Sequence, residues 1–507
     1  MLKNRFPAFL LVLGVAVGLS AGGCAKKEAP APAAASEAVV PTPAGGGKIP
    51  VTTSSEEARA EFLQGRDLAE KLRGTDSIAH FAKAASLDPN FAMAELNLAT
   101  FAPTGNEFFE HLNKAVSLAG KASNGERLLI LAAEAAANNN AVKQKEYLDQ
   151  LVAAYPDDER ARFNLGGYYF AQQDFPKAIE QYKKATELAP TYSTAFNILG
   201  YAYRQNGDYD NAEKAFQKYI ELIPKDPNPY DSYAEFLLKV GRFDDSIAQY
   251  RKALAIEPNF TNAYQGIAMD LAYLGKPAQA EAELEKMARA SRNTGETRTA
   301  LFALTVLHVD GGKMTKALGD VDKRYALAEK TNDVAAMAFD CGTRGNILLE
   351  MGKPDQANAE FERGLKLIEG SNRSQEIKDN ARLVHHYNLA RVALATKDFA
   401  GAKSQADEFR KGAAVSKNPA QAKQAHELDG IVALAEKDFD KAVAELQQAN
   451  QQNPQNLYRL CQAYQGKGEG EKAKDFCAKA ANFNSLPQMN YALVRTKARA
   501  GAGTKKG

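Results

Sequence analysis

Histidine side chains are the first groups in this chain to consider for metal binding or acid–base chemistry. The six histidines are scattered, and only His385 and His386 are neighbours. Adjacent residues of a helix point in different directions, so these two rings would not share one metal ion. No His-x3-His or His-Glu-x2-His pattern occurs, and no nucleophile elbow, phosphate loop or dinucleotide fingerprint is present. We therefore expect no metal site, no cofactor, no catalytic residue and no enzymatic activity.

The helices that would position such side chains are predicted by a sequence block that repeats along the chain. Pro156, Pro190, Pro224 and Pro258 are evenly spaced, and each ends a block of the same kind. Within each block, apolar residues at spacings of three and four predict two amphipathic helices. A turn containing glycine or aspartate and an aromatic residue separates them, and the proline separates one helical hairpin from the next. A fixed period of this length predicts a solenoid of hairpins.

One block carries a large residue, Leu-Gly, Tyr, then Ala, Phe and Pro at set spacings, at positions Phe196, Leu199, Gly200, Tyr203, Ala212, Phe216 and Pro224. This pattern resembles the tetratricopeptide repeat. The resemblance covers residues 58 to 487, which corresponds to about a dozen hairpins. It implies an all-α, right-handed superhelical solenoid with an N-terminal array over 58–294, strongest over 159–294, and a divergent C-terminal array over 295–487. The pattern weakens around 100–145, 295–337 and 370–382, where degenerate repeats, insertions and bends all remain open.

The N-terminus has the pattern of an export signal. Lys3 and Arg5 precede an apolar run over 8–19, and Ser-Ala-Gly-Gly then leads to Cys24. This arrangement resembles the lipobox of bacterial lipoproteins, although Ala21 stands where that family usually has leucine. The resemblance implies a signal peptide over 1–23, lipidation of Cys24, and, from Ala25, outer-membrane sorting with the protein facing the periplasm. The alternatives are an ordinary signal peptide or an uncleaved anchor. Residues 24–57 are rich in Ala, Pro and Gly and are expected to form a disordered tether.

Charge bears on the class of partner. The chain has 64 Lys and Arg against 62 Asp and Glu, and removal of Lys3 and Arg5 with the signal would leave a formally neutral protein. A nucleic-acid-binding protein would normally carry a basic excess, so we expect no nucleic-acid partner. Residues 488–507 include a few basic side chains and are expected to form a flexible basic tail.

Three cysteines follow Cys24 in the chain. Cys461 and Cys477 fall on the first and second helix of one late hairpin, both at inward positions. In an oxidising compartment this placement favours a disulfide between them. Two buried thiols acting as small apolar residues are the alternative.

A partner-binding face follows from the family resemblance alone. In similar proteins the first helix of each hairpin lines a concave groove that binds peptides or helices. The corresponding candidates here are Phe163, Phe170, Asn197, Tyr201 and Arg204. The three aromatic residues fit the core between repeats equally well.

These features together predict a lipid-anchored scaffold that binds protein partners in the cell envelope and has no catalytic role. Assembly or stabilisation of an envelope complex is the expected task. Two alternatives remain: an array that binds a small ligand or glycan, and an envelope enzyme with an unrecognised site in the divergent region 295–385.

Overall fold

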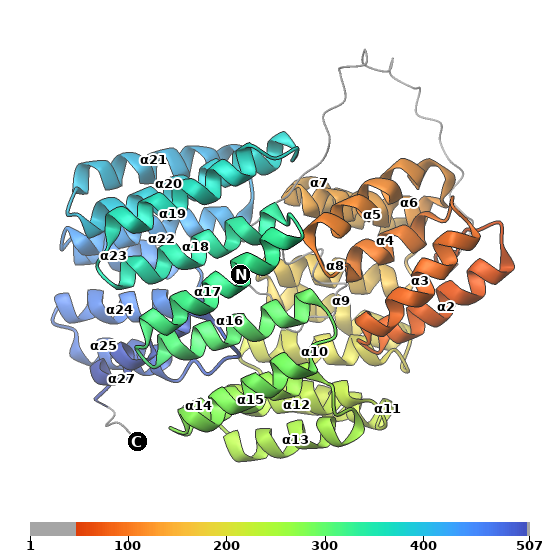
Figure 1. The fold of residues 1–507 in the computed structure, drawn as a ribbon, viewed down its shortest axis with the longest axis horizontal. Helices are drawn as coiled ribbons and strands as arrows, with labels where there is room; N and C mark the ends of the chain where they lie inside the picture. The colour runs from red at the N-terminus through yellow and green to blue at the C-terminus, as the bar shows by residue number, and fades with distance from the viewer. Residues whose placement is uncertain (1–46, 504–507) are drawn as a thin grey trace, which may run out of the picture.

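The computed structural model describes residues 47–503, and it is built from helices packed in consecutive antiparallel pairs (Figure 1). Within these residues there is no β-strand. Twelve hairpins follow one another, so the expected all-α solenoid of tetratricopeptide-type hairpins is confirmed. The signal region, Cys24, tether residues 24–46 and residues 504–507 lie outside the described residues.

The first helices of the hairpins are α2 (Glu56–Glu70), α4 (Ala92–Phe101), α6 (Asn124–Ala137), α8 (Glu159–Ala171), α10 (Ser193–Asn206), α12 (Pro227–Lys239), α14 (Thr261–Tyr273), α16 (Thr294–Asp310), α18 (Val334–Glu350), α20 (Gln375–Ala395), α22 (Pro419–Ala435) and α24 (Pro454–Gly466). The second helices are α3 (Gly74–Leu87), α5 (Gly105–Leu118), α7 (Ala141–Ala154), α9 (Phe175–Leu188), α11 (Tyr209–Leu222), α13 (Phe243–Ile256), α15 (Pro277–Ala290), α17 (Met314–Lys330), α19 (Pro354–Glu369), α21 (Phe399–Ser416), α23 (Phe439–Gln448) and α25 (Gly470–Ala481). A 3₁₀ turn, η1 (Ala119–Lys121), and two short helices, α26 (Met489–Ala492) and α27 (Arg495–Gly501), complete the fold.

Close approach of the two helices in a hairpin depends on a small residue in the first. A Cβ added at Gly166 would lie 2.7 Å from the ring of Tyr182, and one at Gly200 would lie 2.9 Å from Phe216. Because such distances are too short, only glycine lets the aromatic ring of the second helix fill this position. The same relation recurs between Gly345 and Phe361. At these positions the glycine of the repeat pattern is what allows the two helices of a hairpin to pack closely.

The repeats continue through the three stretches where the sequence pattern weakens. Helices α5, α6 and α7 span the first of them, and α16 and α17 span most of the second. The first helices α8, α10, α12 and α14 begin at evenly spaced positions, whereas the intervals from α16 to α18 and from α18 to α20 are wider. The hairpins in this part of the chain are longer, which explains why a search at the shorter, constant period loses them.

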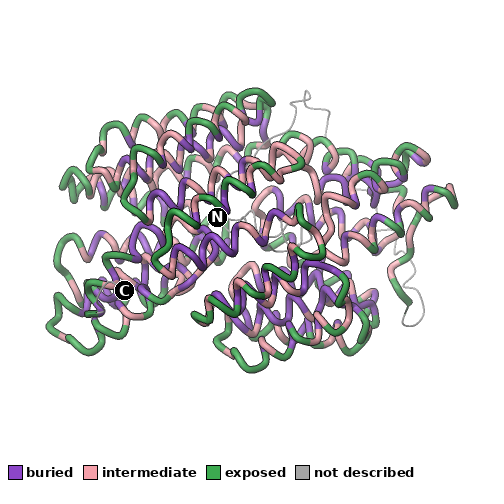
Figure 2. Tube along the Cα trace, turned by 60° about the horizontal axis from the view of Figure 1, so that its bottom comes forward, coloured by how far each residue is buried: buried purple, intermediate pink, exposed green. Residues whose placement is uncertain are grey.

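The solenoid is wound so tightly that distant hairpins touch. The backbone N–H of Gly105 donates to Asp333 at 3.0 Å, and Asn418 donates to the side chain of Asn139 at 2.9 Å. Lys423 reaches the side chain of Gln173 at 3.2 Å. These contacts join hairpins that are far apart in the sequence, and buried positions concentrate on the inner sides of the helices (Figure 2). Hairpins that are distant in the sequence are therefore neighbours in the fold.

Both ends of the described chain are held against the repeats. Ile49 N–H donates to Asp158 at 2.8 Å, and Thr52 N–H donates to Glu126 at 2.8 Å. The side chain of Thr53 donates to Asp88 at 2.6 Å. The expected tether therefore ends earlier than predicted, because residues 47–54 form an edge strap along the starts of the first helices.

The C-terminal prediction is also corrected. Up to residue 503 the predicted flexible tail consists of α26, α27 and their flanks, with Leu493, Val494 and Ala498 buried. Arg495 forms an ion pair with Asp310. Sequence reasoning weighed the basic residues and overlooked the apolar ones between them.

Candidate functional site

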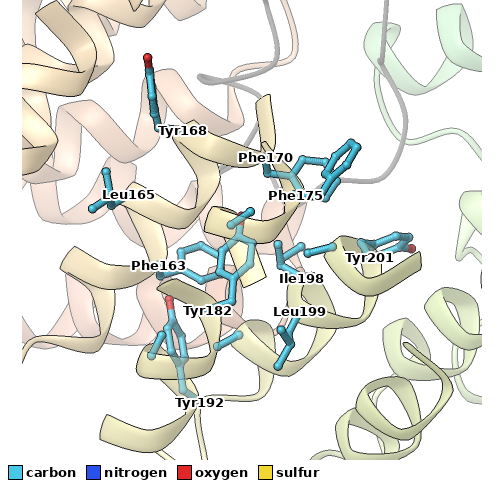
Figure 3. Packing of buried hydrophobic residues seen from close by; sticks show 14 of the residues in the cluster. Phe163, Leu165, Tyr168, Phe170, Phe175, Tyr182, Tyr192, Ile198, Leu199 and Tyr201 are labelled. Atoms are coloured by element: carbon cyan, nitrogen blue, oxygen red, sulfur yellow. The ribbon is translucent and has the colours of Figure 1, made fainter. Parts of the chain in front are cut away.

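The five predicted partner-contact residues are all buried. Phe163, Phe170 and Tyr201 belong to one continuous apolar cluster, in which Phe163 lies between Tyr182 and Tyr192 (Figure 3). Its ring centroid is 5.5 Å from each of these two tyrosine rings. None of the five therefore lines an exposed groove in the described structure, and the aromatic residues pack between repeats, as the alternative interpretation proposed.

The polar candidates on α10 point into a buried network. Tyr201 donates to Glu235 of α12 at 2.8 Å, and Arg204 donates to the other oxygen of that carboxylate at 3.0 Å. The guanidinium of Arg204 also stands 4.6 Å from the centre of the Tyr201 ring. Burial raises the pKa of Tyr201 well above its ordinary value, and the charge of Glu235 acts in the same direction. The hydroxyl therefore remains a neutral donor.

Asn197 occupies the same inner side of α10, one turn before Tyr201. It is 0% exposed, and neither its amide nitrogen nor its amide oxygen has a hydrogen-bond partner among the described residues. The sequence suggested a groove-facing position for Asn197, but gave no indication that this residue would be fully buried.

A second buried network lies in the C-terminal half. Glu427 of α22 accepts hydrogen bonds from Tyr387 at 2.7 Å, Arg459 at 2.6 Å and Asn456 at 3.1 Å. Burial raises the pKa of Glu427, but the charge of Arg459 and these hydrogen bonds bring it below its ordinary value. The carboxylate is therefore ionised and fully engaged. Sequence reasoning missed this network because its members come from separate hairpins.

The divergent region holds a buried cluster with two positive charges and one negative charge. Asp340 of α18 contacts Arg298 of α16 at 2.9 Å and Arg324 of α17 at 3.0 Å. The guanidinium of Arg324 lies 4.9 and 5.0 Å from the ring centres of Phe302 and Phe339. These ion pairs and ring contacts hold three consecutive helices together. A structural role is therefore enough to explain why the charged groups are buried.

The cysteines fall where the hairpin pattern suggested. Cys461 of α24 and Cys477 of α25 are joined as a disulfide, with their Cα atoms 5.2 Å apart. They occupy the register of the glycine and aromatic pairs in other hairpins, because both kinds of pair have the same sequence separation. Cys341 is buried and unbridged, and burial raises its thiol pKa to about 12. Cys341 is therefore a neutral, poorly nucleophilic thiol.

Two further observations concern metals and membranes. Within residues 47–503, no three His, Cys, Asp or Glu side chains are grouped so that they could hold a metal ion. Among the described helices, none combines the length and the apolar character needed to cross a bilayer.

Comparison with known proteins identifies the repeat. A sequence model of the tetratricopeptide repeat matches residues 145–193, 169–227 and 266–333, so the chain contains tetratricopeptide repeats. The third match extends into the region where the sequence pattern weakens. No curated protein matches the chain.

Solved structures with similar segments include tetratricopeptide repeat proteins and a protein named MamA. A thermophilic repeat protein, TTC0263 from Thermus thermophilus, is 23% identical and has a TM-score of 0.31, over 36% of this chain and 99% of its own. A repeat protein from Parabacteroides merdae is 16% identical with a TM-score of 0.31, over 64% of this chain and 98% of its own. The MamA structure is 23% identical with a TM-score of 0.28, over 33% of this chain and 91% of its own.

Proposed function

We propose that this protein is a lipid-anchored scaffold of the cell envelope that binds other proteins through its helical repeats and has no catalytic role. The observation that carries the proposal is the array of twelve hairpins, three stretches of which match the tetratricopeptide repeat. Such arrays present a long surface relative to their core, which suits recognition of extended partners. Assembly or stabilisation of an envelope complex is the task that fits such a surface.

Anchoring through Cys24 is supported by the sequence before it and by the strap after it. Residues 47–54 are bonded to the starts of α4, α6 and α8. Residues 25–46 then connect Cys24 to a fixed point on one edge of the array. At about 3.3 Å per residue they reach about 70 Å from a membrane when fully extended. In this proposal the anchor faces the periplasm from the outer membrane.

Two experiments test the proposal separately. Wild-type protein expressed with radioactive palmitate should be labelled, and Cys24→Ala should remain an unlabelled precursor. Continued labelling of the variant would disprove lipidation at this residue. Chemical crosslinking in intact cells, followed by purification from detergent-solubilised envelope and mass spectrometry, should recover discrete protein partners. Recovery of a copurifying small molecule without a protein partner would contradict the scaffold.

A further inference from the structure

The chain after the last hairpin lies across the C-terminal ends of α12, α14 and α16, which are the first helices of three hairpins in the middle of the array. Lys239, the last residue of α12, donates to the carbonyl oxygen of Phe483, and its ammonium stands 3.7 Å from the centre of the Phe483 ring. The hydroxyl of Tyr273, the last residue of α14, donates to the carbonyl oxygen of Ser485. Backbone groups of residues 483–485 are thus held by side chains from helices far earlier in the sequence.

The following residues fill apolar and charged positions on the same surface. Tyr491 is 2% exposed, and its ring centroid lies 5.8 Å from those of Tyr273 and Phe483. Leu486 packs in the core cluster of α14. Leu493 and Val494 join a cluster whose other members include Val306, Val309 and Ile347.

The contact ends on an ion pair. Arg495 directs two nitrogens at the two carboxylate oxygens of Asp310, the last residue of α16, with Nε 2.6 Å from Oδ1. Its guanidinium also lies 5.2 Å from the centre of the Tyr273 ring. A two-point contact of this kind fixes both position and orientation.

These contacts are those of a bound peptide rather than those of a repeat. Residues 483–488 have no helical structure, and their backbone carbonyls are bonded by side chains of the array. Asn484 adopts a left-handed backbone with φ +37°, a conformation that asparagine accepts more readily than most residues but less readily than glycine. In addition, Lys239 is held beneath Phe483 beside the positive charge of Arg204. The left-handed backbone of Asn484 belongs to the resident segment alone and raises the free energy of the internal contact, so a competing segment with glycine at this position would have an advantage.

We propose that the surface formed by Lys239, Tyr273 and Asp310, with the apolar residues Val306, Val309 and Ile347, is a peptide-binding site. Residues 483–495, the resident segment, occupy it in cis. The partner is a protein segment of the same chemistry: two aromatic side chains followed by aliphatic residues and an arginine. It binds by displacing the resident segment. This inference rests on the proposed function, since it names the site and the kind of segment that a protein partner uses.

The test uses the full-length protein and a fluorescent synthetic peptide with the sequence of residues 480–499. The double substitution Tyr491→Ala with Arg495→Ala weakens the resident segment. The peptide should bind this variant at least tenfold more tightly than wild type, because the wild-type segment competes at the high effective concentration of an intramolecular contact. A peptide carrying the same two alanines should not bind. Adding Asp310→Ala to the protein should also abolish binding.

Hydrogen exchange shows whether the resident segment has been released. Faster exchange over 483–503 with unchanged protection of α12, α14 and α16, and no peptide binding, would overturn the proposal. If the segment stays protected, Val494→Asp replaces the pair as the releasing substitution, and the same criteria apply. Wild-type protein that forms dimers by exchanging this segment between copies would overturn the assignment to a different protein.

The outcome is separable from that of the proposed function. A partner captured from the envelope should compete with the peptide for the Tyr491→Ala, Arg495→Ala protein. A partner that is captured equally by wild type and by Asp310→Ala, and that does not compete, would leave the scaffold intact and overturn this site.

Discussion

Lys239 is held in an environment that disfavours its positively charged form. Burial lowers the pKa of Lys239 to about 7, and the positive charge of Arg204 acts in the same direction, whereas Glu235 acts against both. In the unfolded chain this lysine has its ordinary pKa of about 10.4. Between about pH 7 and pH 10 the unfolded state therefore binds more protons than the folded state, and stability rises with pH through this window.

Lys239→Met should remove this dependence. Its free energy of unfolding, measured by urea denaturation from pH 6 to pH 10, should rise less steeply than that of wild type, by up to about 1.4 kcal/mol per pH unit. Below pH 7 lysine is protonated in both states, so the difference between the two proteins should be constant there. Parallel curves across the whole range would contradict the assignment of the titration to Lys239.

Asp340 is the carboxylate that pairs with both Arg298 and Arg324 in their buried cluster. Asp340→Ala leaves two buried cations without it, and we expect a loss of about 3 to 5 kcal/mol in urea denaturation. Asp322→Ala is the matched control, because Asp322 pairs with Arg344 at the surface and is 60% exposed. It should cost less than about 1 kcal/mol. Similar losses for the two variants would show that the cluster contributes little.

At the scale of elements, the same position in the hairpin is filled either by a glycine–aromatic contact or by a disulfide. In several hairpins a glycine of the first helix accepts an aromatic ring of the second, as Gly200 accepts Phe216. In the last hairpin a disulfide between α24 and α25 occupies that register. In the last hairpin a covalent bond thus takes the place of the contact between an aromatic ring and a glycine.

The last hairpin should therefore depend on redox conditions. Cys461→Ala with Cys477→Ala should lower its stability by about 3 kcal/mol, because the bridge restricts the unfolded loop. Limited proteolysis under native conditions, with mass spectrometry of the cut sites, should show earlier cleavage within 454–481. Reductant should produce the same earlier cleavage in wild type. It should cause no further change in the double variant. Cys341→Ala keeps the bridge and should respond to reductant as wild type does. Equal protection with and without reductant in wild type would contradict this role.

The sequence was most informative about elements and least informative about contacts between them. The constant period placed α8 to α15 correctly, because every copy must repeat the same small and large residues to pack. The longer hairpins from α16 to α21 were harder to find, since their added turns change the period but not the packing rule. The burial of Asn197 and Arg204, and the seating of Tyr491, depend on how tightly the superhelix winds. That winding is a sum of small rotations that no single motif encodes.

At the scale of the molecule, contacts between distant hairpins change how the array should unfold. An open solenoid is held by neighbours only and can unfold repeat by repeat. Here Asn139 bonds to Asn380 at 3.3 Å and to Asn418 at 2.9 Å, which couples the two halves directly. We expect hydrogen exchange in α9 and α21 to report the same unfolding midpoint in urea.

Asn139→Gly tests this coupling without straining the backbone. Asn139 has φ +58°, a conformation that glycine accepts readily, so the substitution mainly removes the side chain's hydrogen bonds. It should lower stability by about 1 kcal/mol and begin to separate the two midpoints. Distinct midpoints already in wild type would show that the halves are independent.

The position of the resident segment at the end of the chain also has a consequence during synthesis. Asp310 precedes Arg495 by 185 residues, and at translation rates of about 5 to 20 residues per second this corresponds to a delay of roughly 10 to 40 s. In an exported chain the same order applies as it emerges N-terminus first on the far side of the membrane, where the surface of α12, α14 and α16 forms before the segment that later covers it. A partner made or exported at the same time meets an open site, whereas a partner that arrives later must compete with a covered one. The order of synthesis would then favour assembly with newly made protein over exchange into finished molecules.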